Sequence, residues 1–419
     1  MKEKVDILLL GRGGRESAIA AKLLESRRLG VLHTSPAQYP GAKWANIGPL
    51  DFQGIRDYCI SNGIDLVFVG PEAPVVAGIK DYLQNHGIEV VAPLRDCGKL
   101  EGSKEFAKEF MSQQSIPTPR FMTVTSETIE EGIDFLESRT APYVVKADGL
   151  AAGKGVMITE SLEEAKFFMR EMLDGLFEES SSTVVLEEFA KGTEVSLFLA
   201  VSGAEYRILT SARDYKKLYN GDKGPNTAGL GSLSPSPQAD ASFIEKVEKR
   251  IIIPTIRGLR DLGLDYKGFL YLGLMDCEGF PMLLEYNVRL GDPETQAIMP
   301  RMESDLIDLL EAIVEGGLKD CDIRFSEKCS VGVVMAAEGY PASVKKGREV
   351  TCLDIRIPGV TLYQGSVRYD KENRCLVEGG RVATSVGIGE NYKDAAENAL
   401  KGAETVTFEG KYYRTDIGS

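Results

Sequence analysis

The chain has 419 residues, too many for one compact core, which predicts two to four modules around a shared site. Hydrophobic residues make up 43% and charged residues 27%, ordinary values for a globular enzyme. The net charge of −14 argues against nucleic acid as a partner, because phosphate backbones bind basic surfaces. Small anionic substrates stay possible, since a local Lys and Arg cluster can attract them into a cleft.

Hydropathy and cysteine usage indicate a cytoplasmic protein. No apolar run approaches the roughly 20 residues that a membrane span needs, so we expect no membrane partner. Residues 1–10 form a short apolar stretch without a small-residue cleavage site, which is typical of a first strand rather than a signal peptide. The seven cysteines are scattered and include no C-x-x-C pair, as in a reduced compartment. With only two histidines, a metal should be held by oxygen ligands.

The first hundred residues alternate short β-branched runs with helical patterns. Strands are predicted over residues 5–10, 65–69 and 89–92, and a glycine turn with an Ala- and Leu-rich helix follows the first of them. This alternation is typical of a parallel sheet with crossover helices. We therefore expect an N-terminal domain over residues 1–102.

After residue 103 the pattern changes to a charged helix, over residues 104–112, and then to strand pairs. Residues 143–146 are expected to pair with 156–158, and residues 183–189 with 195–201. Longer helices are predicted over about 243–262 and 305–315. From residue 329 a glycine-punctuated, strand-rich segment ends in a helix over 392–403. The expected boundaries are near residues 102 and 327, which gives a central domain over 103–327 and a C-terminal domain over 328–419.

Two glycine-rich segments could bind phosphate. Residues 11–16 (Gly-Arg-Gly-Gly-Arg-Glu) follow a strand and open a helix, where backbone N–H groups attract anions. Glu16 stands where the dinucleotide fingerprint needs glycine, and no acidic residue closes the second strand, so NAD is disfavoured. A phosphate-bearing small substrate and a tight turn without a ligand both stay open.

The second segment, residues 146–155 (Lys-Ala-Asp-Gly-Leu-Ala-Ala-Gly-Lys-Gly), is not a P-loop. Its glycine spacing is one residue short, and Gly155 replaces the Ser or Thr that would hold Mg²⁺. It lies between two predicted strands, as a flexible hairpin loop flanked by lysines that can close over a triphosphate. A solvated hairpin without a ligand is the alternative, but Lys146, at the end of an apolar strand, would then be a partly buried cation with no ligand to bind.

Acidic and amide side chains gather near residue 285. Residues 284–289 alternate like a strand, so Glu285, Asn287 and Arg289 are expected to project from one face. This set suits Mg²⁺ coordination beside a phosphate or carboxylate clamp, although an exposed polar strand face would show the same alternation. The turn over residues 291–296 (Gly-Asp-Pro-Glu-Thr-Gln) adds two acids, a density that favours a binding site.

These motifs resemble the ATP-grasp ligases and, within them, the phosphoribosylamine–glycine ligase family, along essentially the whole chain. The segments that carry the resemblance are residues 13–16, 70–74, 77–78, 103–104, 110–111, 116–118, 146–156, 224–227, 289, 291–296 and 413–418. The resemblance implies an ATP-grasp fold with an N-terminal Rossmann-like (pre-ATP-grasp) parallel-sheet domain and a small C-terminal strand-rich α+β domain. It also implies a mobile lid over about residues 120–190, and a monomer or weak homo-oligomer.

The resemblance further implies a reaction and its participants. Glycine and 5-phosphoribosylamine would be joined through a glycyl phosphate, with ATP and Mg²⁺ or Mn²⁺ as cofactors. The implied ATP-binding residues are Lys104, Lys146, Gly153, Lys154, Gly155, Glu187, Glu188, Phe189 and Glu194. The metal ligands would be Glu285 and Asn287. The implied residues around glycine, the acyl phosphate and the amine substrate are Arg289, Asp292 and Asp214 as catalytic groups, with Gly13, Gly14, Asn226 and Thr227.

The chain departs from the family pattern mainly on the side of the amine substrate. Ser17 and Tyr215 stand where the family commonly has histidines, and Ala228, Leu230 and Leu290 replace other common residues. These departures leave open an ATP-grasp ligase that acts on another amine or acid. A nucleotide-binding regulatory protein without catalysis is the third interpretation, and the presence of Glu285, Asn287, Arg289 and Asp292 argues against it.

Overall fold

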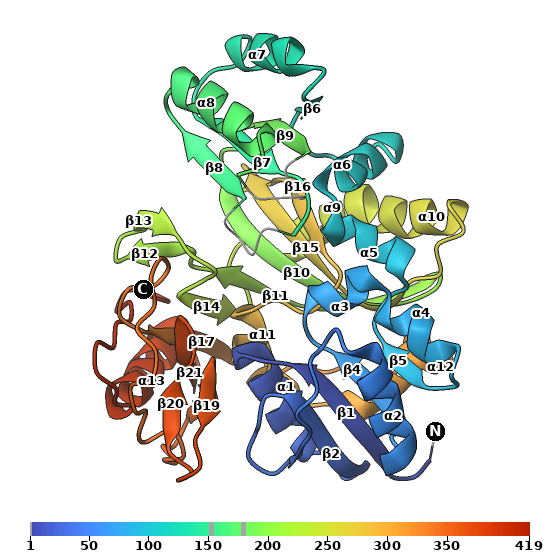
Figure 1. Ribbon diagram of the computed structural model, residues 1–419, viewed down its shortest axis with the longest axis vertical. Helices are drawn as coiled ribbons and strands as arrows, with labels where there is room; N and C mark the ends of the chain where they lie inside the picture. Colours follow the sequence, from blue (N-terminus) through green and yellow to red (C-terminus); the bar gives the residue numbers. More distant parts are fainter. Residues whose placement is uncertain (1, 151–154, 177–181) are drawn as a thin grey trace.

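The computed structural model describes residues 2–150, 155–176 and 182–419, and its N-terminal part is a five-stranded parallel sheet with the order β3-β2-β1-β4-β5 (Figure 1). All four residues of β4 and six of the seven residues of β1 are buried, because helices cover both faces of a parallel sheet. The strands are β1 (Val5–Gly11), β2 (Leu29–Pro36), β3 (Lys43–Trp44), β4 (Leu66–Val69) and β5 (Glu89–Val91). The helices are α1 (Gly14–Leu24), α2 (Phe52–Asn62), α3 (Glu72–Ala77), α4 (Ile79–Gln84) and α5 (Arg95–Gly102).

A four-stranded antiparallel sheet with two helices stands at the top of Figure 1. The preceding helix α6 (Lys104–Gln113) starts at Ser103, whose hydroxyl accepts the N–H of Phe106 and caps the helix. The order β6-β9-β7-β8 gives the sheet its own small core against α7 and α8. The elements are β6 (Phe121–Thr125), α7 (Ile129–Glu137), β7 (Tyr143–Ala147), β8 (Val156–Thr159), α8 (Leu162–Leu173) and β9 (Thr183–Glu188).

An eight-stranded sheet links the middle of the chain to its C-terminal part, in the order β16-β15-β10-β11-β14-β17-β21-β18. Its strands are β10 (Thr193–Ser202), β11 (Glu205–Asp214), β14 (Gly231–Ser234), β15 (Lys267–Cys277), β16 (Phe280–Asn287), β17 (Cys329–Ala336), β18 (Val360–Gln364) and β21 (Arg381–Gly389). Two small hairpins stand outside it, β12 (Lys217–Tyr219) with β13 (Lys223–Asn226), and β19 (Val367–Tyr369) with β20 (Cys375–Val377).

The remaining helices pack on the large sheet and on the N-terminal sheet. They are α9 (Ala241–Val247), the π turn η2 (Glu248–Ile252), α10 (Ile253–Asp261), α11 (Glu294–Ile298), the 3-10 turns η3 (Met299–Arg301) and η4 (Leu318–Asp320), α12 (Leu306–Glu315) and α13 (Tyr392–Thr405). Two of the hydrophobic cores contain residues from both the N-terminal sheet and β10 and β15, so these parts share a core. No helix in the described ranges is long and apolar enough to cross a membrane.

The expected fold class is confirmed, with a parallel N-terminal sheet, central antiparallel sheets and a strand-rich C-terminal part. The hairpin of residues 143–146 with 156–158 is confirmed as β7 and β8, with Lys146 opposite Val156. The expected pairing of residues 183–189 with 195–201 is wrong. β9 lies between β6 and β7, and β10 lies between β11 and β15, so each strand already has two neighbours and they belong to different sheets.

The expectation that Glu285, Asn287 and Arg289 share one strand face is also wrong in part. β16 ends at Asn287, and Arg289 lies in the bend that follows it. A bulge at Leu284 shifts the register, because Gly273 faces Glu285 while Leu274 faces Leu283. The Arg289 side chain turns back and donates to the Asn287 side-chain oxygen at 2.8 Å, so the three groups still lie together.

Candidate active site

Two lysines flank a buried glutamate where α6 meets the four-stranded sheet. Lys146 Nζ lies 2.7 Å from Glu187 Oε1, and Lys108 Nζ lies 3.1 Å from Glu187 Oε2. Burial raises the pKa of Glu187, but the two lysine charges outweigh burial and hold that pKa below its ordinary value. Burial lowers the pKa of Lys108 to about 8. Lys146 and Glu187 were predicted, whereas Lys108 was missed although it follows Lys104 by one helical turn.

The loop after β7 is fastened to the start of α6. The carboxylate of Asp148 accepts the backbone N–H groups of Lys104 and Glu105 and the hydroxyl of Ser103. A carboxylate at a helix N-terminus is favoured by the helix dipole. Lys104 Nζ donates to the carbonyl of Gly149 at 2.9 Å, which brings this cation to the glycine-rich loop.

Of the predicted loop residues, Gly155 is described and buried, whereas Gly153 and Lys154 lie outside the described residues.

The chain passes from the small sheet to the large sheet between β9 and β10. Glu188 ends β9, and Phe189 follows it with 38% of its side chain exposed. Glu194, in β10, forms an ion pair of 2.6 Å with Lys216, a residue that the motifs did not predict. These residues therefore border the same junction as Lys146 and Glu187, which are on the adjacent strands β7 and β9.

Glu285 is an exposed residue whose carboxylate is surrounded by cations. Desolvation by the surrounding protein raises its pKa, but the charges of Lys216, Lys146 and Lys104 outweigh this effect and hold the pKa below its ordinary value. Among the described residues, Glu285 makes no hydrogen bond or ion pair. Its carboxylate and the Asn287 amide oxygen fit a hard cation that takes its other ligands from phosphates and water. The described residues contain no cluster of three or more His, Cys, Asp or Glu side chains that could hold a metal by itself.

Arg289 is held between two carboxylates from the N-terminal part of the chain. Its Nε lies 3.0 Å from Glu72 Oε2, and its Nη2 lies 2.8 Å from Glu101 Oε1. Glu101 also accepts the N–H of Val288 at 2.7 Å. Burial, together with the nearby charge of Glu72, raises the pKa of Glu101 to about 7 despite the opposing charge of Arg289. The Arg289 guanidinium is therefore fixed in direction, with 17% of its side chain exposed.

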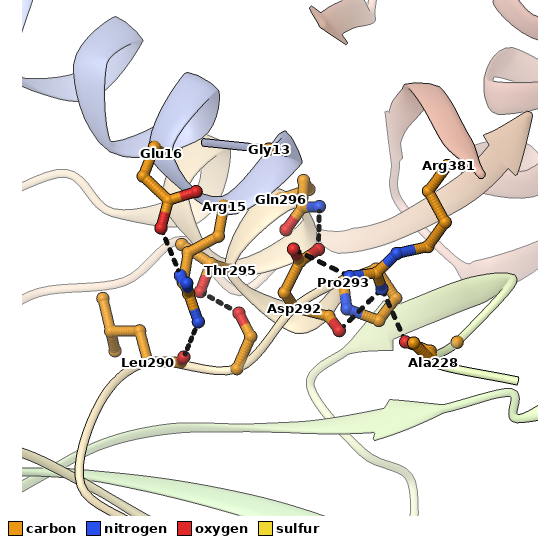
Figure 2. A network of polar contacts seen from close by, with 12 residues as sticks. Gly13, Arg15, Glu16, Ala228, Leu290, Asp292, Pro293, Thr295, Gln296 and Arg381 are labelled. Carbon is orange, nitrogen blue, oxygen red and sulfur yellow. Dashed lines mark hydrogen bonds and ion pairs between the residues drawn. The ribbon is translucent and has the colours of Figure 1, made fainter. Parts of the chain in front are cut away.

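Figure 2 shows the network around Asp292, which joins three distant parts of the chain. Asp292 Oδ1 accepts from Gln296 Nε2 at 2.7 Å, and Asp292 Oδ2 lies 2.9 Å from Arg381 Nη2. Arg381 also donates to the backbone carbonyls of Asp292 and Ala228. Burial raises the pKa of Asp292, but the charges of Arg381 and Arg15 outweigh burial and lower it. Arg381 was not predicted, because no motif marks it.

The N-terminal glycine turn packs against the same loop. A side chain at Gly14 would overlap Gln296, since a Cβ there would lie 2.2 Å from Nε2. Gly13 has a φ of 133°, and a Cβ there would lie 3.4 Å from Asp292 Oδ2. Beside the turn, Arg15 pairs with the buried Glu16 at 2.7 Å (Figure 2). The predicted residues Gly13, Gly14 and Asp292 are thus brought together.

Asp214 and Glu294 form a pair of neighbouring acids. Burial and the charge of Glu294 raise the pKa of Asp214 well above its ordinary value, and burial also raises that of Glu294. Glu294 accepts the hydroxyl of Ser196 at 3.0 Å. Asp214 Oδ1 is buried and has no hydrogen-bond partner among the described residues. An unpartnered carboxylate oxygen of this kind can accept a bound ammonium group.

The two predicted substrate residues of the glycine loop differ in their surroundings. Thr227 is fixed, because its hydroxyl donates to the carbonyl of Lys216 at 2.8 Å and accepts the N–H of Gly229 at 3.1 Å. Asn226 ends β13 with an exposed side chain, and its backbone faces Lys217. The loop that contains Asn226 and Thr227 therefore leaves the chain just after Lys216 and returns to Lys216 through Thr227, close to Asp214 in sequence.

Comparison with known proteins identifies the family. Family models of phosphoribosylglycinamide synthetase match the N domain to residues 5–101, the ATP-grasp (A) domain to residues 102–295 and the C domain to residues 330–419. A phosphoribosylamine–glycine ligase from Caldanaerobacter subterraneus subsp. tengcongensis is 38% identical over 417 residues, which cover 99% of each chain. One from Pasteurella multocida is 38% identical over 421 residues, covering 99% of this chain and 97% of the relative.

Solved structures of similar proteins support the same family. A crystal structure of phosphoribosylamine–glycine ligase from Thermotoga maritima has a TM-score of 0.84 and 34% identity, covering 98% of this chain and 100% of that chain. A biotin carboxylase from Campylobacter jejuni shares the fold alone, with a TM-score of 0.74, 13% identity and coverage of 99% and 94%. The expected resemblance is confirmed: the chain belongs to the phosphoribosylglycinamide synthetase family of ATP-grasp ligases, which implies that it uses ATP.

Proposed function

We propose that this protein ligates glycine to 5-phosphoribosylamine, with ATP converted to ADP and phosphate, and so forms glycinamide ribonucleotide in purine biosynthesis. Its relatives are named for this activity. The observation that carries the proposal is a continuous series of charged groups. It runs from Lys146 and Lys104 through Glu285 to Arg289, whose charge acts on both Glu285 and Asp292. A carboxylate activated at one end of such a series can meet an amine at the other.

The lysines at one end of the charged series, Lys104 and Lys146, suit the phosphates of ATP. Lys104 and Lys146 both lower the pKa of Glu285, so all three groups lie close together. Lys146 shares Glu187 with Lys108, and Lys104 forms no ion pair among the described residues, so phosphates bound there would supply negative charge that these cations lack. We propose that Glu187, Glu188, Phe189 and Glu194 border the nucleoside, since they line the junction between β9 and β10. Gly153, Lys154 and Gly155 would close over the phosphates.

Glu285 and Asn287 would hold Mg²⁺ or Mn²⁺. When bound, the cation would neutralise charge on the transferring phosphoryl group. The chain's own contribution there is the Glu285 carboxylate, which forms no ion pair among the described residues, and the Asn287 amide oxygen, which Arg289 orients.

The acceptor end would bind glycine and then the amine. The unpartnered Oδ1 of Asp214 is suited to the glycine ammonium, whose charge would favour the ionised form of that carboxylate. The glycine carboxylate would attack the γ-phosphate of ATP, with Arg289 stabilising the charge that develops. The amine of phosphoribosylamine, held near Gly13, Gly14 and Asp292, would then displace phosphate from glycyl phosphate. Thr227 and Asn226 would border the acyl group.

The proposed division into domains and a lid suits a reaction that passes through an acyl phosphate. We propose domains over residues 1–102, 103–327 and 328–419, with residues 120–190 as a lid. The small sheet has its own hydrophobic core, which allows it to move as one body over the phosphates. Closure would exclude water, which protects an acyl phosphate from hydrolysis.

The decisive experiment measures ADP release from the purified protein with Mg²⁺-ATP and glycine, with and without freshly generated phosphoribosylamine. ADP that requires both substrates supports the proposal. ADP that appears with another amine or acid, but not with phosphoribosylamine, would move the assignment to a different ATP-grasp ligase. No ADP under any of these conditions would contradict ligase activity.

A further inference from the structure

The loop between β11 and β14 has little support of its own. We define the substrate loop as residues 217–229, which comprise the hairpin of β12 and β13 and the segment up to Gly229. All four residues of β13 are exposed, and the hairpin is a sheet of only two strands. Such hairpins are marginally stable alone, so contacts from elsewhere must fix this one.

Arg414, near the end of the chain, supplies one set of these contacts. Its side chain is 1% exposed, and its Nη1 donates to the Lys217 carbonyl at 3.0 Å and to Asp222 Oδ1 at 2.8 Å. Its other nitrogens form a bidentate pair with Asp416 at 2.8 and 2.7 Å. The guanidinium also lies 5.2 Å from the ring centroid of Tyr215. One buried cation thus joins the first strand and the turn of the hairpin to the C-terminal residues.

Further hydrogen bonds follow the same edge. The side chains of Asn220 and Thr415 bond at 2.7 Å, and the N–H of Gly221 donates to Asp416 Oδ2 at 2.7 Å. Tyr412 donates its hydroxyl to the Leu218 carbonyl at 2.8 Å. The C-terminal residues therefore bind both the first strand and the turn of the hairpin.

Arg381 fixes the opposite end of the loop. It is the first residue of β21, and it donates to the carbonyl of Ala228 while it pairs with Asp292 Oδ2 at 2.9 Å (Figure 2). A hydrogen bond from Arg381 to the Asp292 carbonyl, at 2.8 Å, gives a second contact between these two residues. The end of the substrate loop and the Asp292 loop consequently share one cation.

We propose that Arg381 and Arg414, both within the C domain, are positioning residues that hold the substrate loop at its two ends and so set the affinity for glycine. The inference rests on the proposed function of Asn226, Thr227 and Asp292. Ordering a loop in advance removes part of the entropy that binding must otherwise overcome. No described contact of Arg381 or Arg414 reaches Lys104 or Lys146, so ATP binding should not depend on them.

The test compares Asp222→Asn and Arg381→Lys with a matched control. Asp222 has a φ of 53°, which asparagine tolerates, and its side chain is 53% exposed, so the variant should fold. The control is Asp370→Asn, which weakens an arginine pair of 2.7 Å, with Arg374, in the β19–β20 hairpin. Each test variant should raise KM for glycine about tenfold, the effect of losing one charge-assisted hydrogen bond. KM for ATP should change by less than about twofold in the test variants. In the control variant, KM for glycine and KM for ATP should both change by less than about twofold.

Hydrogen exchange provides a readout that does not need activity. Backbone amides of residues 217–229 should exchange faster in Asp222→Asn than in the unmodified protein, and at an unchanged rate in Asp370→Asn. Faster exchange together with a higher KM for glycine supports the proposal. Unchanged exchange, or faster exchange without a change in KM for glycine, overturns it. If the unmodified protein forms no ADP with glycine and phosphoribosylamine together, the proposed function fails, while unchanged exchange would independently refute the positioning role.

Discussion

The guanidinium of Arg289 lies 2.8 Å from the carboxylate of Glu101, and this contact joins the end of β16 to the end of α5. Glu72 holds the same guanidinium from the start of α3. The N-terminal sheet domain and the ATP-grasp domain therefore meet at one oriented cation. Such an arrangement favours a transition state that develops negative charge beside Arg289, because no reorganisation is needed when the charge appears.

Replacing Arg289 with alanine should remove that stabilisation. We expect kcat/KM to fall by an amount equivalent to about 2–4 kcal/mol, the usual cost of losing one oxyanion donor. Steady-state ADP release measures the loss, and thermal unfolding shows whether the two carboxylates left unpaired also weaken the fold. Arg28→Ala is the control, since Arg28 pairs with Asp308 and Glu311 away from the site. Unchanged turnover in folded Arg289→Ala would remove Arg289 from the reaction.

Glu101 should make stability depend on pH. Its pKa is raised from 4.5 in the unfolded chain to about 7 in the folded protein, so the folded state holds the extra proton between these values. The protonated group contributes stability below about pH 4.5, and this contribution is lost as the pH rises through 7. The difference corresponds to about 3 kcal/mol.

Glu101→Gln should therefore flatten the decline of unfolding free energy between pH 5 and pH 8, measured by urea denaturation. Glu109→Gln, on the exposed face of α6, serves as the control and should leave the decline in place. A decline of unchanged slope in Glu101→Gln would show that other groups cause it.

Several parts of this architecture follow from local sequence patterns. The β7–β8 hairpin is predictable because two apolar runs flank a glycine- and lysine-rich turn, and the N-terminal sheet is predictable from alternating strands and helices. Lys146 and Glu187 could be proposed as site residues from the family motifs. Their mutual ion pair could not, because it depends on β9 lying beside β7 rather than beside β10.

Contacts between distant segments were the least predictable part of the site. Arg381 follows Asp292 by 89 residues and stands in no recognisable motif, so only the fold shows that the two residues pair. Lys108 could have been found from its helical spacing to Lys104, since residues four apart lie on one helix face. The bulge at Leu284 could not have been found in this way, because it depends on the register of β16 with β15.

The buried group of Lys146, Glu187 and Lys108 should be sensitive to loss of its acid. In Glu187→Gln the two lysines would face each other without a carboxylate, and breaking a buried pair costs about 3–5 kcal/mol of unfolding free energy. Urea denaturation measures the loss, and adding Lys108→Met should recover part of it by removing one buried cation. The comparison is the pair of Lys166 with the half-exposed Glu137, and Glu137→Gln should change stability little. Equal stability of Glu187→Gln and Glu137→Gln would contradict this account.

Removing the Glu285 carboxylate should weaken the binding of Mg²⁺ and so change the Mg²⁺ dependence of the reaction. In Glu285→Gln the amide keeps the shape of the side chain but loses the charge, so the Mg²⁺ concentration for half-maximal ADP release should rise on the order of tenfold. Thermal unfolding without Mg²⁺ should show only a modest loss of stability, because the side chain is exposed and makes no hydrogen bond among the described residues, so that only its attraction to Lys216, Lys146 and Lys104 is removed. Glu278→Gln, in the exposed turn of the same β15–β16 hairpin, controls for a general effect of removing one negative charge. A Mg²⁺ titration that shifts equally in both variants would place the cation elsewhere, whereas a shift confined to Glu285→Gln would assign that carboxylate to the metal.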